Sequence, residues 1–192
     1  MRMASVFELL SILFFAFGIN MIPFASPSNL FIASNAALLV DADPVRIGIL
    51  VALGSTSAKL IHYVVTFFVG KYVGEERRKR LDTTALKTKR WAFPAIIIAA
   101  ASPIPDEPVI VTLGLMKYNP AKFSLAYFAG KLPITIIGAS LGGFGESLLG
   151  GYLTQSVLAI ISIILTIGIT LVLLKVNLSE TAKRLLKKLR MG

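Results

Sequence analysis

Long apolar stretches, separated by short polar or basic ones, dominate the chain. Five stretches carry few charged residues, and they cover residues 6–40, 47–74, 92–116, 123–145 and 152–174. The hydrocarbon core of a bilayer is about 30 Å thick and needs about 20 consecutive apolar residues in a helix. The pattern therefore predicts an all-α integral membrane protein rather than a soluble domain.

Composition supports a membrane protein and excludes several kinds of chemistry. Of the 192 residues, 55% are hydrophobic and 16% are charged, whereas soluble domains carry about 25% charged residues. The chain has no cysteine and one histidine, so we expect no disulfide and no metal site. It contains no nucleotide-binding, serine-hydrolase or zinc-protease motif, so we expect neither an enzyme nor a cofactor. Arg2 precedes the first apolar stretch, but no Ala-x-Ala site interrupts that stretch, so no cleaved signal peptide is expected.

The net charge of +10 is concentrated in two runs beside the apolar stretches. Residues 71–90 hold eight Lys or Arg against three acids, and residues 175–190 hold six against one. Cytoplasmic loops of membrane proteins are rich in Lys and Arg, and such runs also contact anionic lipid. We therefore expect a multi-pass protein of the cell (plasma) membrane with the loop 71–90 and the C-terminus in the cytoplasm. We expect membrane lipids as partners and no nucleic acid.

With both basic runs inside, residues 92–116 must begin and end on the cytoplasmic side. Their centre, Ser102–Pro108, contains three prolines and two acids, which break a helix and are costly in lipid unless protein or water surrounds them. We therefore expect this segment to enter the membrane and turn back. The complete prediction is a span over 4–22, a re-entrant segment over 23–40, a span over 45–72, a basic loop over 75–90, a re-entrant segment over 92–117, spans over 121–145 and 152–175, and a basic amphipathic tail over 179–190.

An internal repeat supports this topology. At an offset of 76 residues, Ala25-Ser26-Pro27 aligns with Ala101-Ser102-Pro103, Pro44 with Pro120, and Gly54 with Gly130. One span lies between the two copies, so they enter from opposite faces. We expect two inverted repeats, each a re-entrant helical hairpin plus a transmembrane helix, with flanking transmembrane helices. In transporters of this architecture the site lies where the broken helices meet. Two ordinary helices kinked by proline are the alternative.

The second hairpin resembles the DedA/VTT (SNARE-associated) membrane protein family. The resemblance rests on a proline-rich tip, a glycine half a helix later and an aromatic residue that opens the next span, namely Ser102–Gly114, Met116, Phe123 and Gly130-Lys131. It implies a lipid flippase or scramblase. Bacterial members recycle undecaprenyl phosphate with coupling to the proton gradient, and eukaryotic relatives scramble phospholipids. Two departures stand out: Ser28-Asn29 occur where an acid is usual, and Asp106-Glu107 occur where arginines often flank the tip.

The acids Asp106 and Glu107 are the first candidates for chemistry. Burial and the proximity of two acids favour the protonated form of one carboxyl, which would suit a proton-coupling site. Helix capping is the alternative, because acids favour a helix N-terminus and Pro108 would be the first helical residue.

A polar stripe on the span that follows the first hairpin provides further candidates. Lys59, His62, Tyr63 and Thr66 follow helical spacing, so they should face the hairpins or a wet cavity. Lys59 could neutralise Asp106 or Glu107, or it could bind a lipid phosphate. His62 could relay protons. A purely structural ion pair is the alternative for this stripe.

Three cations and two uncharged polar residues complete the candidates. Lys131 could bind substrate or could pair with Glu107 for stability alone. Ser28 and Asn29 could hold a phosphate oxygen at a half-helix N-terminus or could act as a cap. Arg46 and Lys122 occupy matching repeat positions and could contact lipid headgroups, although interfacial cations often only snorkel to the membrane surface. The motif Gly138-x-x-x-Gly142 predicts close helix packing.

These features predict a transporter that moves a lipid phosphate between leaflets, with a polyprenyl phosphate as a candidate substrate and protons as a candidate coupling ion. A secondary transporter of a small solute or cation and a non-transporting membrane scaffold are the two alternatives. The sequence leaves open whether the protein is a homo-oligomer.

Overall fold

The computed structural model describes residues 4–23, 27–70, 91–102 and 106–149, without the side chains of residues 146 and 149, and the single positions 157, 160, 161 and 164. These residues form helices and no strand. The helices are α1 (Val6–Asn20), α2 (Asn29–Leu39), α3 (Pro44–Val69), the helix Trp91–Ala101, α5 (Glu107–Leu115) and α6 (Pro120–Leu149). The predicted all-helical class is thus confirmed for this part of the chain. The loop predicted over 75–90 and the tail over 179–190 lie outside the described residues, as does the span over 152–175 except at the four single positions.

Among the helices of the described residues, α3 and α6 are long and apolar enough to cross a bilayer. Each begins at a proline, Pro44 or Pro120, which suits the first helical turn because its missing N–H would have no helical partner there. The residue before Pro120 also caps its helix, since the Asn119 Oδ1 accepts a hydrogen bond from the Lys122 N–H at 3.0 Å. Asp43 stands before Pro44 but its side chain forms no such bond.

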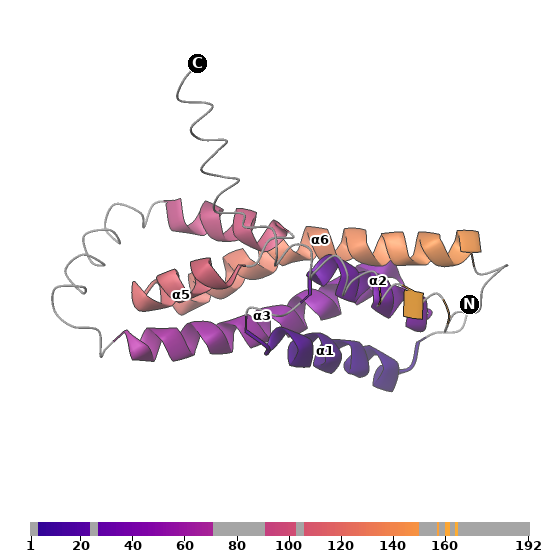
Figure 1. The fold of residues 1–192 in the computed structure, drawn as a ribbon, viewed down its shortest axis with the longest axis horizontal. Helices are drawn as coiled ribbons and strands as arrows, with labels where there is room; N and C mark the ends of the chain where they lie inside the picture. Colours follow the sequence, from indigo (N-terminus) through magenta and orange to yellow (C-terminus); the bar gives the residue numbers. More distant parts are fainter. Residues whose placement is uncertain are drawn as a thin grey trace, which may run out of the picture.

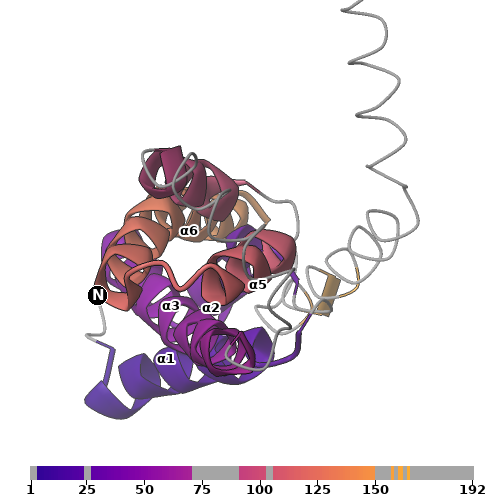
Figure 2. The ribbon, with the colours of Figure 1, turned by 90° about the vertical axis from the view of Figure 1, so that its left-hand side faces the viewer.

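The long helices run in opposite directions along the molecule, and the shorter helices occupy its two ends (Figure 1). At one end α1 and α2 form a pair, and at the other end the helix Trp91–Ala101 pairs with α5. The two helices of each pair meet near the middle of the long helices (Figure 1). We name residues 20–23 and 27–29 the first tip, and residues 102, 106 and 107 the second tip. Seen end-on, α1 lies outside α3, and the helix Trp91–Ala101 lies outside α6 (Figure 2).

Glycines allow the close contacts between these helices. A Cβ added at Gly54 would meet the Leu13 carbonyl oxygen of α1 at 2.5 Å, and a Cβ at Gly130 would meet the Ile97 carbonyl oxygen at 2.5 Å. The two glycines aligned by the 76-residue offset therefore perform the same task, because each brings the outer helix of one pair against a long helix.

The inner helices pack on the long helices in a second matched arrangement. The helix α2 lies against α6, where Gly138 and Gly142 leave no room for a Cβ beside the backbone of Leu30 and Ser34. The helix α5 lies against α3, where Gly114 meets Thr66. The close packing predicted from Gly138-x-x-x-Gly142 is thus confirmed.

Helix α1 lies within the segment predicted as a span over 4–22 and is shorter than it. Helix α1 has 15 residues, which at 1.5 Å per residue reach about 22 Å and so fall short of a bilayer core. It begins in a capping box, in which the Ser5 Oγ accepts from the Glu8 N–H at 3.2 Å and the Glu8 carboxylate accepts from the Ser5 N–H. It ends at Asn20, whose buried side-chain amide bonds to the Ala16 carbonyl and to Asn29. This buried polar contact joins the end of α1 to the start of α2 midway along the bundle.

Two apolar cores lie along the bundle with a polar layer between them. Along α3 the core residue Val51 belongs to the cluster around α1 and α2, whereas Tyr63 belongs to the cluster around α5. Along α6, Tyr127 belongs to the cluster around α5 and Ala139 belongs to the cluster around α1 and α2. A buried lysine lies between the two clusters on each long helix, and the tips reach the same level. Large apolar side chains cover the outside, including Phe7, Phe14, Leu53, Phe68, Leu125 and Phe144.

Candidate functional site

Four buried charged side chains meet at the second tip. Lys59 comes from α3 and Lys131 from α6, while Asp106 precedes α5 and Glu107 is its first residue. Their exposed fractions are 1%, 4%, 8% and 3% in that order. Removing such groups from water costs several kcal/mol per ion unless opposite charges and hydrogen bonds compensate. The arrangement of partners therefore decides whether this cluster is stable.

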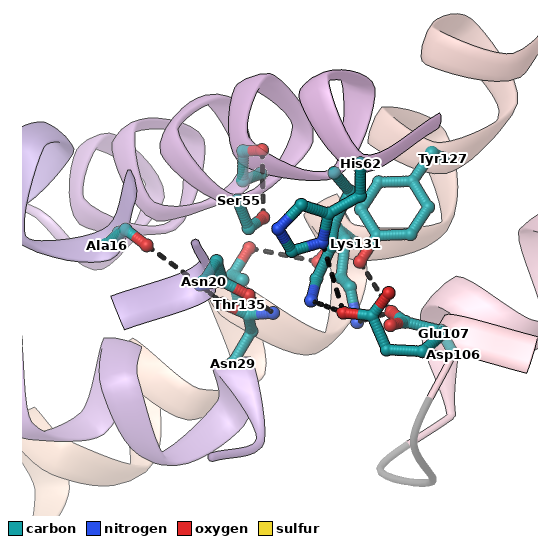
Figure 3. Close-up of polar contacts among 12 residues, drawn as sticks. Ala16, Asn20, Asn29, Ser55, His62, Asp106, Glu107, Tyr127, Lys131 and Thr135 are labelled. Atoms are coloured by element: carbon teal, nitrogen blue, oxygen red, sulfur yellow. Dashed lines mark hydrogen bonds and ion pairs between the residues drawn. The ribbon is translucent and has the colours of Figure 1, made fainter. Parts of the chain in front are cut away.

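Each lysine pairs with a different acid. Figure 3 shows both acids beside Lys131, His62 and Tyr127. The Lys131 Nζ lies 3.0 Å from the Asp106 Oδ2, and the Lys59 ammonium donates to the Glu107 Oε1. Lys131 therefore pairs with Asp106 rather than with Glu107, the structural partner that the sequence offered as an alternative to substrate binding. Successive residues at a helix start point in directions about 100° apart, so Asp106 and Glu107 reach different long helices. Their charges tie the second tip to both α3 and α6.

Tyr127 provides a further contact that the sequence analysis did not identify. Its hydroxyl donates to the Asp106 Oδ2, its side chain is buried, and its ring centroid lies 5.2 Å from the Lys131 Nζ. A signal existed in the sequence, because Tyr127 precedes Lys131 by one helical turn on the same face. The Asp106 carboxylate thus accepts hydrogen bonds from the Lys131 ammonium and from a phenol. These bonds compensate for the free-energy cost of its burial.

His62 lies one turn after Lys59 and reaches both tips. Its Nδ1 lies 3.3 Å from the Glu107 Oε1, and its Nε2 lies 3.1 Å from the Met21 carbonyl oxygen. The predicted polar stripe on α3 therefore divides into two halves. Lys59 and His62 face the charged cluster, whereas the Tyr63 hydroxyl donates to the Tyr118 carbonyl.

The first tip is polar but carries no charge in its described residues. The Asn20 and Asn29 side chains donate to each other, with N–O distances of 2.9 and 3.2 Å, and both are buried. Asn29, a predicted site residue, is thus engaged by a partner that the sequence analysis did not single out. Ser28 stands at the N-cap position of α2 but makes no side-chain capping bond.

A comparison with family models decides the family of this chain. The model of the VTT domain matches residues 22–144, which include α2, α3, α5, both lysines and both acids. The chain belongs to the VTT-domain family. The resemblance to the DedA/VTT family found in the sequence is confirmed. Members of this family are membrane proteins with proposed transporter or flippase-like roles. No curated protein and no solved structure matches the chain.

Two predicted site residues of the VTT domain lie away from the charged cluster. Arg46 is in the first turn of α3 and Lys122 is in the first turn of α6, and both are exposed. Because the long helices run in opposite directions, these cations lie near opposite ends of the bundle (Figure 1). Their positions suit contact with the membrane surface rather than with the buried acids.

The side chains of the charged cluster limit the ligands that this part of the VTT domain could hold. No group of three or more His, Asp or Glu side chains is close enough to hold a metal ion within the described ranges. Two lysines from different helices could instead hold the oxygens of one phosphate, since phosphate accepts several charge-assisted hydrogen bonds. Such an anion would have to displace the carboxylates that occupy the lysines.

Proposed function

We propose that this VTT-domain protein moves a lipid phosphate between the leaflets of the membrane, with protons as the coupling ion. The buried cluster of two lysines and two acids carries the proposal, because it lies midway between two apolar cores in a bundle with an apolar exterior. Charge at such a depth is expensive and is usually retained for transport or proton transfer. A polyprenyl phosphate is our first candidate substrate.

The proposed architecture is two inverted repeats, each with a re-entrant hairpin and a spanning helix. Three observations support it: the hairpins approach from opposite ends (Figure 1), Gly54 and Gly130 make equivalent contacts, and each inner helix packs on the long helix of the other repeat. The loop 71–90 and the C-terminus would lie in the cytoplasm of a cell with this protein in its plasma membrane. The membrane lipids would be partners, and no cofactor or enzymatic step is part of the proposal.

The pairing within the cluster suggests how protons would enter the cycle. If phosphate oxygens took the place of a carboxylate at Lys59 or Lys131, that acid would be left buried without its partner. An unpaired buried charge costs about 3–5 kcal/mol, and a carboxyl avoids this cost by taking up a proton. Entry of the anion and protonation of Glu107 or Asp106 would therefore occur together. The lipid tail would stay in the bilayer beside the apolar outer faces of the helices.

A reconstituted flipping assay tests the proposal. Purified protein in liposomes is supplied with a labelled polyprenyl phosphate or a labelled phospholipid, with pH varied on each side. We expect transbilayer movement of the phosphate lipid with the native protein, and a loss of at least tenfold with Lys59→Gln or Lys131→Gln. Lys117→Gln removes an exposed lysine and is the matched control, for which we expect native rates.

The closed pairing of all four charges also favours one rival, a non-transporting scaffold. A scaffold would tolerate Lys59→Met combined with Glu107→Leu, because this change removes a complete ion pair at similar volume. If that double variant is stable and supports normal cell growth, and liposomes with the native protein move no lipid, the transport proposal is wrong. Ion-dependent uptake of a small solute, insensitive to lipid composition, would instead identify a secondary transporter.

A further inference from the structure

His62 joins the two tips through acceptors on both sides of its ring. The Met21 carbonyl oxygen at 3.1 Å from Nε2 can only accept a hydrogen bond, and an ionised Glu107 at 3.3 Å from Nδ1 can also only accept. A neutral imidazole carries one N–H, so it can satisfy one of these partners but not both. The second ring nitrogen would then present its lone pair to an oxygen.

One additional proton resolves this conflict. If it resides on His62, the imidazolium donates to both oxygens. If it resides on Glu107, the carboxyl donates to Nδ1 while Nε2–H donates to Met21. The two forms have the same proton count and the same two hydrogen bonds, so the proton belongs to the pair rather than to either residue.

The charged groups around His62 determine how the added proton changes the net charge of the cluster. Glu107 also accepts from Lys59 on the same helix as His62, while Asp106 accepts from Lys131 and from Tyr127 on α6. The first tip faces the ring with a backbone carbonyl and with neutral Asn side chains. Two lysines and two carboxylates sum to zero charge, so the added proton gives the cluster a charge of +1.

We infer that one exchangeable proton shared by His62 and Glu107 bridges the two tips through the His62 ring, and that its loss removes the hydrogen bond between His62 and the second tip. With the proton the cluster has a net positive charge that attracts an anion, and without it the cluster is neutral. The tip contact requires only the geometry described above, whereas its coupling to a transported phosphate rests on the proposed function.

The single histidine of the chain makes the proton directly observable. With ¹⁵N-labelled histidine in vesicles of phosphatidylcholine and phosphatidylglycerol, every ring signal belongs to His62. Between pH 5 and pH 9 we expect Nδ1 to lose its hydrogen-bonded proton while Nε2 keeps its own. In Glu107→Gln the side-chain amide can donate to Nδ1 at every pH, so this transition should disappear. Asp41→Asn, which removes an exposed carboxyl, should leave the transition unchanged.

The separation of the tips is measured in the same vesicles. Because the chain lacks cysteine, Ile22→Cys with Ala101→Cys places two spin labels at exposed positions beside the two tips. We expect a narrow distance distribution at pH 5.5 and a broader, longer one at pH 8.5, with Glu107→Gln narrow at both. A native distribution that does not change with pH, or a ring that does not titrate, would overturn the inference.

Transport is measured separately so that the two proposals can fail independently. If the tips respond to pH but no phosphate lipid moves, the proposed function is wrong and the proton-dependent contact stands. If lipid moves while the tips and the ring are insensitive to pH, the inference is wrong and the transport function stands.

Discussion

Lys131 on α6 and Asp106 at the second tip form a buried ion pair with 3.0 Å between Nζ and Oδ2. Lys59 on α3 pairs with the neighbouring Glu107, so a single tip is held by both long helices. Consecutive acids with separate lysines make the second tip the point where α3 and α6 are electrostatically connected. The consequences of this arrangement can be tested at individual residues.

Removal of one charge should destabilise the protein more than removal of both. Lys131→Met leaves Asp106 buried without its cation, and we expect a loss of about 3–5 kcal/mol. Lys131→Met combined with Asp106→Leu should recover most of this loss, since no unpaired charge remains. Chemical unfolding in detergent micelles measures both variants. Equal losses for the single and double variants would contradict a role for the ion pair in stability.

Tyr127→Phe tests the hydrogen bond to Asp106 while the buried ring is retained. A hydrogen bond to a charged group contributes about 1.5–3 kcal/mol, and we expect a destabilisation of that size with slower lipid movement. Tyr63→Phe is the matched control, because it removes a buried hydroxyl that donates to a neutral backbone carbonyl. It should cost about 1 kcal/mol and should leave transport near native. A greater transport defect in Tyr63→Phe would argue against Tyr127 as the residue that positions Asp106.

The amide pair of the first tip should behave as a unit. Asn29→Leu leaves the buried Asn20 Oδ1 without its donor, although the Asn20 Nδ2 still donates to the Ala16 carbonyl, and an unsatisfied buried polar group costs about 1–3 kcal/mol. Asn20→Leu combined with Asn29→Leu should be closer to native in stability than either single variant. Thermal unfolding monitored by circular dichroism provides the comparison, and strictly additive losses would show that the two amides do not depend on each other.

Neighbouring glycines of α6 should differ sharply in their tolerance of a methyl group. At Gly142 a Cβ would collide with the backbone of Ser34 on α2, whereas at Gly143 nothing lies within 4 Å. We expect Gly142→Ala to cost about 1–3 kcal/mol through overpacking and Gly143→Ala to be neutral or slightly stabilising, since alanine favours a helix. Unfolding of the two variants under identical conditions measures the difference. Equal stability would mean that α2 does not pack on α6 at this point.

Local features of the sequence were sufficient to predict the all-helical class and the family of the chain. Apolar length, proline positions and charge placement act through nearest neighbours and membrane thickness, so they predicted the regions of α3 and α6 and the family resemblance. They also singled out Lys59, His62, Asp106, Glu107 and Lys131 as charged or titratable groups within apolar stretches.

The tertiary structure alone decided which of these side chains meet. The pairing of Lys131 with Asp106, the hydroxyl contact of Tyr127, and the joining of Asn20 with Asn29 depend on how separate helices approach and rotate. Packing between helices also bears on where a helix ends. Helix α1 ends at Asn20, whose buried amide bonds to Asn29 at the start of α2. A sequence pattern specifies which groups need compensation in the membrane, but the compensating partner is set by packing between helices distant in the chain.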